Sequence, residues 1–312
     1  NSHNGMAYGR QTRSEKQPAH SPIAHKEFRM NIVLFGASGF IGRRVAQILR
    51  AHGHTLRTPS HREFDYLQPN EAAAREILRG ADAVFNCIGV MSRYADVLET
   101  VHHRTPALLA KIAAEQGVRH WVQLSALGAD PKHAVNFVGS KGRGDEAVCQ
   151  IGAAHGMRVA VARPSIVYGR GGASCELFIK LAWLPVIALP AGGRFMLQPV
   201  HANDVADGLV RLLENGAPHG TIIPFTGSLQ TSLAGYLAAM RTGLHRKPPL
   251  RVLPIPLALV KPFLPLTNVL SNGMVSAGSF VLLEEGSCAD CTAFAELLGR
   301  EPLGVEEFWA VE

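Results

Sequence analysis

Three glycines spaced three residues apart, Gly36, Gly39 and Gly42, constrain the fold of this chain more than any other feature. They follow the apolar run Asn31–Phe35 and open a segment, Ile41–His52, whose apolar residues recur at helical spacing. In such a turn the glycines allow a tight bend, close approach of a pyrophosphate, and close helix–strand packing, in that order. Free N–H groups at the helix start then favour phosphate. We therefore predict a dinucleotide-binding turn made of Gly36, Ala37, Ser38, Gly39, Phe40, Ile41 and Gly42.

Strand-like and helix-like segments alternate after this turn, which is typical of a parallel sheet wrapped by helices. We expect strands at Thr55–Thr58, Ala83–Cys87, His120–Leu124 and Arg158–Ala162, and a further one at Glu63–Tyr66. We expect helices at Glu71–Arg79, Ala95–Gln116 and Lys141–His155. Together with the glycine turn these segments give about six strand–helix units, enough for an α/β fold with a doubly wound parallel sheet of the Rossmann type.

The chain is expected to divide into three parts. Residues 1–29 are polar without apolar periodicity and are predicted to be a flexible N-terminal arm or an expression remnant. Residues 30–164 form the predicted dinucleotide-binding core. Beyond Pro164 prolines become frequent and the alternation weakens, so residues 165–312 are predicted to form a smaller C-terminal lobe that partly returns to the sheet.

Composition narrows the class of protein. With 47% hydrophobic and 18% charged residues, the chain can bury a sizeable core. A net charge of +6 favours a phosphorylated small molecule over nucleic acid, for which the chain carries no motif. The longest apolar stretches, Leu177–Pro190 and Val252–Leu266, fall short of the roughly 18 residues of a membrane span. We expect a cytoplasmic protein with an apolar face suited to a membrane surface or a membrane-protein partner.

Five scattered cysteines suit a reducing compartment. Cys288 and Cys291 form a CxxC pair, but a zinc site needs a second pair of ligands and a redox pair needs a βαβ context. We therefore expect two incidental thiols and no metal.

The segment after the second expected strand indicates which dinucleotide is bound. An NAD site presents an acidic residue about 20 residues after the glycine turn. Here Ser60, His61 and Arg62 occupy that region, and Arg62 can offer a fork of donors to a 2′-phosphate. Arg43 and Arg44 add positive charge, unless these arginines are only solvated surface. We predict NADP(H), with NAD(H) as the alternative that Glu63 would favour.

Six motifs together resemble the atypical short-chain dehydrogenase/reductase (SDR) superfamily, which includes epimerase-like proteins. They are GASGFIG at 36–42, ADAVFNCIG at 81–89, VQLSALGAD at 122–130, GSK at 139–141, ARPSIVYG at 162–169 and QPVHANDVA at 198–206. Within the superfamily the chain resembles the branch of the nucleotide-binding accessory subunit of respiratory complex I. It also resembles the SDR portion of proteins fused to a DoxX-like membrane domain, as Leu283–Leu298 indicates.

The resemblance implies roles for particular residues. Ser125 would bond the substrate carbonyl, Lys141 would hold the nicotinamide ribose, and His201 would face the cleft, which gives the predicted catalytic set. The resemblance also implies that the adenine and ribose side of the cofactor is contacted by Asn86, Ile88 and Gly89. It implies that the nicotinamide end is contacted by Pro164, Ser165 and Val167.

The sequence departs from the superfamily four residues before Lys141, where the catalytic tyrosine is replaced by Phe137. A benzyl ring cannot exchange the proton that carbonyl reduction requires. His102 and His103 stand where many relatives have a water-ordering asparagine. Three hypotheses stay open: an NADP(H)-dependent oxidoreductase acting on a carbonyl or quinone with non-standard proton delivery, a nucleotide-binding structural or redox-sensing module without turnover, and a membrane-associated scaffold.

Overall fold

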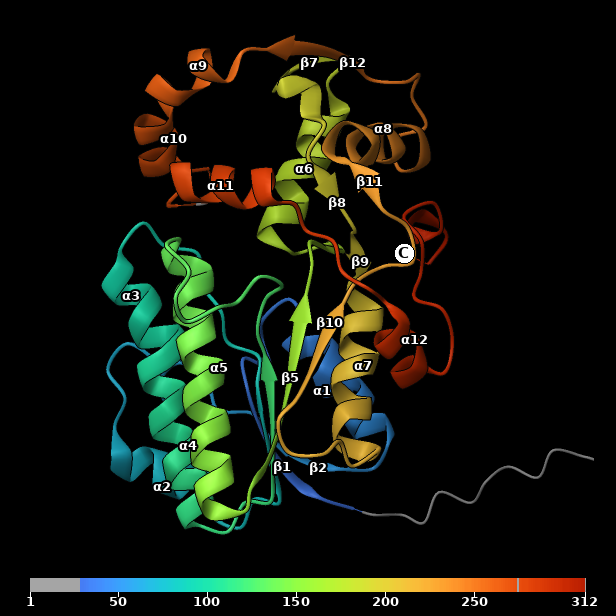
Figure 1. The fold of residues 1–312 in the computed structure, drawn as a ribbon. Coiled ribbons are helices and arrows are strands. Elements are labelled where there is room, and N and C mark those ends of the chain that lie inside the picture. The colour runs from blue at the N-terminus through green and yellow to red at the C-terminus, as the bar shows by residue number, and fades with distance from the viewer. Residues whose placement is uncertain (1–28, 274, 312) are drawn as a thin grey trace, which may run out of the picture.

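A computed structural model describes residues 29–273 and 275–311, so the predicted N-terminal arm lies, apart from Arg29, outside the described residues. Its centre is a six-stranded parallel sheet in the order β10-β5-β4-β3-β1-β2 (Figure 1). The strands are β1 (Asn31–Phe35), β2 (Thr55–Arg57), β3 (Ala83–Asn86), β4 (His120–Leu124), β5 (Arg158–Pro164) and β10 (Thr221–Phe225). This confirms the predicted doubly wound α/β class.

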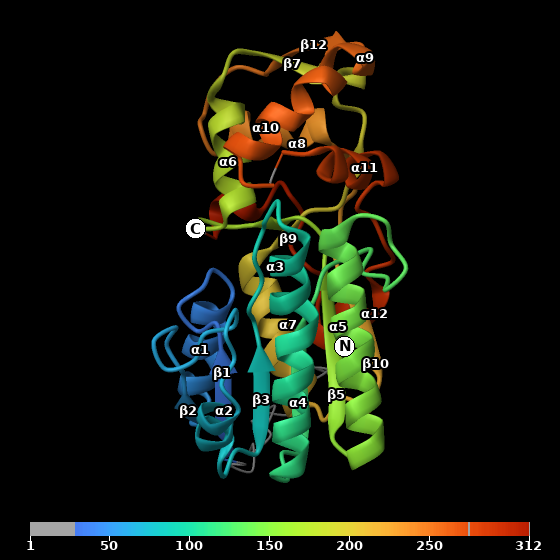
Figure 2. The ribbon, with the colours of Figure 1, turned by 90° about the vertical axis from the view of Figure 1, so that its left-hand side faces the viewer.

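Alternate residues of the buried strands serve two separate cores, one on each face of the sheet. Ile32 and Leu34 of β1 pack with helices α1 (Gly42–Ala51), α7 (Ala202–Glu214) and α12 (Thr292–Leu298). Val33 and Phe35 pack on the opposite face. The helices there are α2 (Glu71–Leu78), α4 (Thr105–Glu115) and α5 (Asn136–His155) (Figure 2). Because both faces are covered, these strands read as continuous apolar runs.

Three details of the fold differ from expectation. Glu63–Tyr66 is not a strand, because Phe64 and Tyr66 fold back to pack edge-on or tilted against Phe35 with ring centroids 5.7 Å apart. The sixth strand is instead β10, which joins β5 from far along the chain. The expected long helix is split into α3 (Ala95–Glu99), a π-helical turn at Thr100–Arg104, and α4.

The region above the carboxyl edge of the sheet forms a second layer with its own core (Figures 1 and 2). Its helices are α6 (Ala173–Trp183), α8 (Leu233–Gly243), α9 (Leu257–Val260), α10 (Leu264–Leu270) and α11 (Ala277–Glu285). Its short strands pair as β6 (Val167–Tyr168) with β9 (Val200–His201), β7 (Val186–Pro190) with β12 (Arg251–Ile255), and β8 (Met196–Leu197) with β11 (Thr231–Ser232). We refer to α6 and to the elements from β7 to β8 and from α8 to α11 as the distal lobe.

Asp204 fixes the C-terminal segment to the sheet domain. Its side chain, fully buried at the start of α7, accepts hydrogen bonds from Arg300 Nη2 at 2.5 Å and from the Leu303 amide at 2.8 Å. None of the helices in the described residues is long and apolar enough to cross a membrane.

Candidate cofactor and active site

The glycine turn has the geometry that its sequence predicts. Gly36 has a φ of +83°, and its carbonyl accepts the Gly39 amide at 2.9 Å. A Cβ on Gly42 would lie 2.0 Å from that same carbonyl oxygen, so any larger residue would push α1 away from β1. Ile41, at the N-cap of α1, makes no side-chain cap among the described residues, and the first turn carries no acid. This helix start is therefore open to a phosphate.

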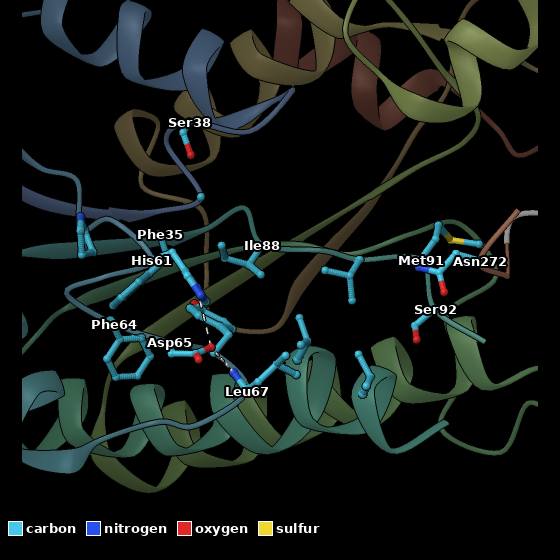
Figure 3. Close-up of a pocket in the computed structure, with 16 residues that line it drawn as sticks. Phe35, Ser38, His61, Phe64, Asp65, Leu67, Ile88, Met91, Ser92 and Asn272 are labelled. Atoms are coloured by element: carbon cyan, nitrogen blue, oxygen red, sulfur yellow. Dashed lines mark hydrogen bonds and ion pairs between the residues drawn. The ribbon is translucent and has the colours of Figure 1, made fainter. Parts of the chain in front are cut away.

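A cavity of about 400 Å³ extends from this turn along the carboxyl edge of the sheet (Figure 3). Figure 3 shows His61 and Asp65 toward one end of it and Met91 and Asn272 at the other. Asn272 comes from the loop after α10, so the distal lobe contributes to the wall. The lining consists of Phe35, Gly36, Ser38, Pro59, His61, Phe64, Asp65, Tyr66, Leu67, Ile88, Val90, Met91, Ser92, Val97, Val101 and Asn272.

The turn after β2 holds groups that favour both forms of the cofactor. The Glu63 carboxylate accepts hydrogen bonds from the Ser60 amide and the Ser60 hydroxyl, each at 2.8 Å, and these bonds lower the pKa of Glu63. Arg62 is exposed beside it. His61 lines the cavity with Nδ1 3.7 Å from Asp65 Oδ1. An anionic carboxylate therefore shares this turn with the guanidinium that is expected to bind a 2′-phosphate.

Arg43 and Arg44 brace the glycine turn from the outside. Arg43 Nη2 donates to the Arg170 carbonyl at 2.7 Å, and Arg44 Nε donates to Asn203 Oδ1 at 3.2 Å. Arg44 also lies over the Phe40 ring at 4.9 Å. These contacts connect α1 to the loop after β6 and to α7.

Asn86, at the end of β3, belongs to a buried polar chain. Its Oδ1 accepts from Tyr66 Oη at 3.0 Å and from the Ile88 amide at 3.3 Å, while its Nδ2 donates to Gln123 Oε1 at 3.1 Å. Burial raises the pKa of Tyr66 well above its usual value. The network fixes the loop at residues 87–90, which carries Ile88 and Val90 into the cavity wall.

Lys141 brings a buried amine to the back of this loop. A Cβ on Gly89 would lie 3.4 Å from Lys141 Nζ and 4.0 Å from His102 Nε2, so the absence of a side chain at Gly89 leaves room for both groups. Nζ donates to the Leu124 carbonyl at 3.4 Å. Burial lowers the pKa of Lys141 to about 8, although the Asp145 carboxylate opposes that shift.

His102 is held as a neutral ring on the π-helical turn. Its Nε2 accepts the Val90 amide at 3.1 Å, so Nδ1 carries the proton and donates to Ser140 Oγ at 3.0 Å. Burial, followed by the charge of Lys141, lowers the pKa of His102 to about 2. The ring therefore positions the loop at Val90 rather than exchanging protons near neutral pH.

Phe137 occupies the first turn of α5 between these two groups. Its ring meets the His102 ring edge-on at 5.5 Å, and Lys141 Nζ lies 5.7 Å from its centroid. The position expected for a hydroxyl group is thus filled by a ring that neither donates nor accepts a proton.

Ser125 is turned toward α5. Its hydroxyl donates to Asp145 Oδ2 at 2.7 Å, and Arg163 donates to the same oxygen through Nε and Nη2 at 3.1 and 3.0 Å. Asp145 is buried, which raises the pKa of its carboxyl group. Because the Ser125 hydroxyl donates its hydrogen bond to Asp145, only its oxygen lone pairs remain for other hydrogen bonds.

The residues expected at the nicotinamide end follow β5. Pro164 ends β5, the Ser165 amide donates to the Phe225 carbonyl at 3.0 Å, and Val167 begins β6. The Ser165 hydroxyl donates to the Gln198 carbonyl. His201 caps α7, where its Nδ1 accepts the Asn203 amide at 3.2 Å. The His201 ring packs against Tyr168 and Phe308, with centroids 5.7 and 5.4 Å away.

The sequence reasoning missed several residues that shape this site. Asp65, Tyr66 and Asn272 line the cavity, and Asp145 holds Ser125. A signal for Asp145 exists in hindsight, since it lies four residues after Lys141 and therefore on the same helix face. Asn272 gives no such signal, because only the tertiary fold carries it to the cavity.

No group of three or more metal-ligating side chains occurs among residues 29–273 and 275–311. Cys87, Cys149, Cys288 and Cys291 are free cysteines in the described structure, and the Cys175 sulfur accepts the Gly169 amide at 3.3 Å. Burial raises the pKa of Cys87 to about 12 and that of Cys149 to about 11, which keeps both protonated at neutral pH.

Comparisons with known proteins agree with this geometry. The sequence profile of the "NAD dependent epimerase/dehydratase family" matches residues 32–223, more than half of the 312-residue chain. The mouse protein "NADH dehydrogenase (ubiquinone) 1 alpha subcomplex subunit 9, mitochondrial" is 26% identical over 243 residues. That match covers 69% of this chain and 63% of the mouse protein, so the chain spans less than two thirds of this relative.

Two solved structures show the same fold at low sequence identity. A dTDP-4-dehydrorhamnose reductase from Bacillus anthracis in complex with NADP aligns with a TM-score of 0.66 and 15% identity, over 90% of this chain and 97% of its own. A mutant UDP-glucuronic acid 4-epimerase from Bacillus cereus, in complex with UDP-4-deoxy-4-fluoro-glucuronic acid and NAD, aligns with a TM-score of 0.64 and 16% identity. It covers 90% of this chain and 98% of its own.

Proposed function

The chain belongs to the NAD dependent epimerase/dehydratase family, and from that premise we propose that it is an NADP(H)-dependent oxidoreductase whose proton comes from Lys141. The substrate class we propose is a carbonyl or a quinone. When bound, the reduced nicotinamide supplies a hydride. The observation that carries the proposal is a buried amine with a pKa near 8 behind Gly89, in the loop whose Ile88 and Val90 line the cavity.

The residues of the cavity fit a dinucleotide. The open N-terminus of α1 and the close approach at Gly36 and Gly42 suit the pyrophosphate, and the apolar walls around Phe35 and Ile88 suit the adenine end. We propose that Arg62 binds the 2′-phosphate of NADP(H). Glu63 weakens the preference for NADP(H), because its negatively charged carboxylate is bonded to Ser60 beside Arg62.

Proton delivery falls to Lys141 because the other candidates are engaged. His102 keeps a neutral ring with both nitrogens bonded, and Phe137 carries no exchangeable proton. His201 uses Nδ1 to cap α7. A lysine with a pKa near 8 holds its proton at neutral pH and releases it with little penalty. In a carbonyl reduction, the role of Lys141 would be to give its Nζ proton to the substrate oxygen, which becomes the hydroxyl of the alcohol.

Ser125 has a positioning role in this scheme. While the Ser125 hydroxyl donates its hydrogen bond to Asp145, it cannot donate to a substrate carbonyl and polarise it. A substrate oxygen close to Ser125 would have to draw that proton from the carboxylate, which Arg163 keeps partly neutralised.

A nucleotide-binding module without turnover is the second candidate, and Phe137 is the observation that favours it. The likeness to a subunit of a ubiquinone-linked NADH dehydrogenase also supports a protein that works against a membrane complex or a membrane surface. In that case NADP(H) stabilises the fold or reports the redox state of the nucleotide pool.

Stopped-flow oxidation of bound NADPH by a panel of quinones, aldehydes and ketones separates the two candidates. An oxidoreductase shows NADPH oxidation with at least one class, at a rate that falls as the pH rises through about 8, because Lys141 loses its proton. Tight binding of NADPH without oxidation by any member of the panel would instead assign the module.

A further inference from the structure

We propose that the end of the distal lobe farthest from the six-stranded sheet binds an anionic lipid bilayer surface. The surface is formed by the end of α6, the β7–β12 strand pair, and the segment from α9 to α10, which lie together in Figures 1 and 2. It presents apolar side chains that the fold leaves in solvent and a cationic composition with no acidic residue.

The segment from α9 to α10 exposes a helical stripe. Leu259, Phe263, Leu266 and Val269 recur at spacings of four, three and three residues and are 64, 63, 60 and 54% exposed. Leu264 faces inward and is buried. In a protein that stayed in water throughout, the large apolar residues of such a stripe would face the core.

The neighbouring strand pair extends the same kind of surface. β12 pairs in parallel with β7, so that Arg251 lies beside Val186 and Leu253 beside Ala188. Val186 and Leu253 are 43 and 55% exposed, whereas the intervening Ile187 is buried. The outward face of this small sheet is therefore apolar with a cation at its edge.

Trp183 and Lys247 give this surface the anchor expected at a membrane interface. Trp183, at the end of α6, is 54% exposed, and Lys247 Nζ lies 3.3 Å from its ring centroid. Indole rings prefer the headgroup level, and a lysine beside them can extend to lipid phosphate while its methylenes stay apolar.

Charge favours a lipid surface over a second protein core. Residues 177–203 and 215–283, which contain the strands and helices of this surface, include no Asp or Glu. They do include six basic residues that are not buried, namely Lys180, Arg194, Arg246, Lys247, Arg251 and Lys261. A seventh, Arg241, is buried and donates to the carbonyls of the chain around it. Anionic headgroups attract such a cluster, and no internal carboxylate competes for it.

Length restricts the mode of binding. The apolar segment Leu257–Leu270 has 14 residues, contains Pro262 and Pro265, and carries Lys261 as its single charge. About 20 residues are needed to cross the hydrocarbon core, whereas 10–14 suit an interfacial segment. The surface is therefore built to lie in the interface rather than to span it.

The test is co-sedimentation of the full chain with vesicles of phosphatidylglycerol and phosphatidylcholine, compared with vesicles of phosphatidylcholine alone. The proposal predicts binding at least tenfold tighter to the anionic vesicles, and weaker binding at high salt. The double variant Phe263→Glu/Leu266→Glu should lose at least tenfold in affinity. Lys261→Gln should lose about fivefold, the contribution expected of one basic side chain near the surface.

Leu229→Glu is the matched control, since Leu229 is 46% exposed outside the apolar surface and should leave vesicle binding unchanged. A second double variant, Val186→Glu/Leu253→Glu, probes the strand pair, so that misfolding of the helical variant cannot decide the result. Binding to neither vesicle type would overturn the proposal. So would a dimer that the same variants dissociate, because the occupant would then be a second copy.

Discussion

The six-stranded sheet and the distal lobe bury their apolar side chains to very different degrees. Four of the five residues of β1 are buried, and the cores on both faces of the sheet are closed by helices. In the segment from α9 to α10, Leu264 is buried whereas Phe263 and Leu266 on either side of it are exposed. The sheet region buries its apolar side chains within the chain, whereas the distal lobe leaves several of them exposed.

The two regions meet at the cavity that we propose for the cofactor. Asn272, from the loop after α10, lines the cavity, and a Cβ on Gly273 would lie 2.7 Å from the Ser92 backbone. The segment that we assign to a membrane surface thus ends against the loop that forms the wall of the nucleotide cavity. This contact makes the comparison testable from both sides.

The largest effect is expected from the sheet region. Gly42→Ala should weaken NADPH binding about 100-fold, because overpacking by a Cβ only 2.0 Å from the Gly36 carbonyl forces α1 away from β1. Gly39→Ala is the milder companion, since its Cβ would lie 3.1 Å from the same oxygen. Isothermal titration measures both, and equal affinities for Gly42→Ala and the wild type would break the link between turn and nucleotide.

A gain of function should follow from restoring the missing hydroxyl. Phe137→Tyr should raise NADPH-dependent carbonyl reduction by about 100-fold, the range typical of positioned general acids. The new hydroxyl would stand between His102 and Lys141. Steady-state kinetics with the best carbonyl of the panel gives the ratio. A rate no higher than that of the wild type would argue against proton delivery as the limiting element.

Cofactor choice is sharpened by two adjacent substitutions. Arg62→Ala should weaken NADPH about tenfold and leave NADH unchanged, because only NADPH carries the 2′-phosphate that an arginine fork binds. Glu63→Gln should act in the opposite direction by removing a carboxylate from Ser60. Fluorescence titration with both nucleotides compares the variants, and equal losses of both after Arg62→Ala would refute the assignment.

A separate effect concerns acid stability, which is measured as a free energy of unfolding rather than as an affinity. The pKa of His102 falls to about 2 in the folded chain, below that of the unfolded chain, so protonation favours unfolding. Stability is full above about pH 6.5 and should decline below it by up to about 1.4 kcal/mol per pH unit. His102→Gln should flatten this decline in urea titrations. His120, whose pKa falls to about 4, and carboxylates with a lowered pKa such as Asp82 and Glu99 contribute to the remaining slope. A profile unchanged by His102→Gln would contradict a neutral buried ring.

The sequence predicted the sheet region well because short periodic signals determine it. The glycine trio and the apolar runs at β1, β3, β4 and β5 specify strands wherever they occur. The strand predicted at Glu63–Tyr66 was wrong, because aromatic residues are typical of strands and here they lie in a turn and pack on Phe35. A partial return of residues 165–312 to the sheet was expected, but β10 itself was not located, because its place depends on pairing with β5 across a long stretch of chain.

The residues of the candidate site also fall into those that local spacing predicts and those that depend on long-range packing. Turn residues such as Gly36 and Gly42 follow from local spacing, whereas the orientation of a side chain does not. Ser125 was expected to face a substrate, and its bond to Asp145 emerges only when the fold brings α5 beside the end of β4. For the same reason the neutral state of His102 could not be predicted from the sequence, because it depends on where the fold places the Val90 amide.

Titration of the purified protein with NADPH and NADH, followed by nucleotide fluorescence, tests the central claim most directly. If the cavity at the glycine turn binds the nucleotide, both NADPH and NADH should bind saturably, with NADPH the tighter, and Gly42→Ala should weaken the binding of NADPH about 100-fold. Failure of the wild type to bind either nucleotide would contradict the claim.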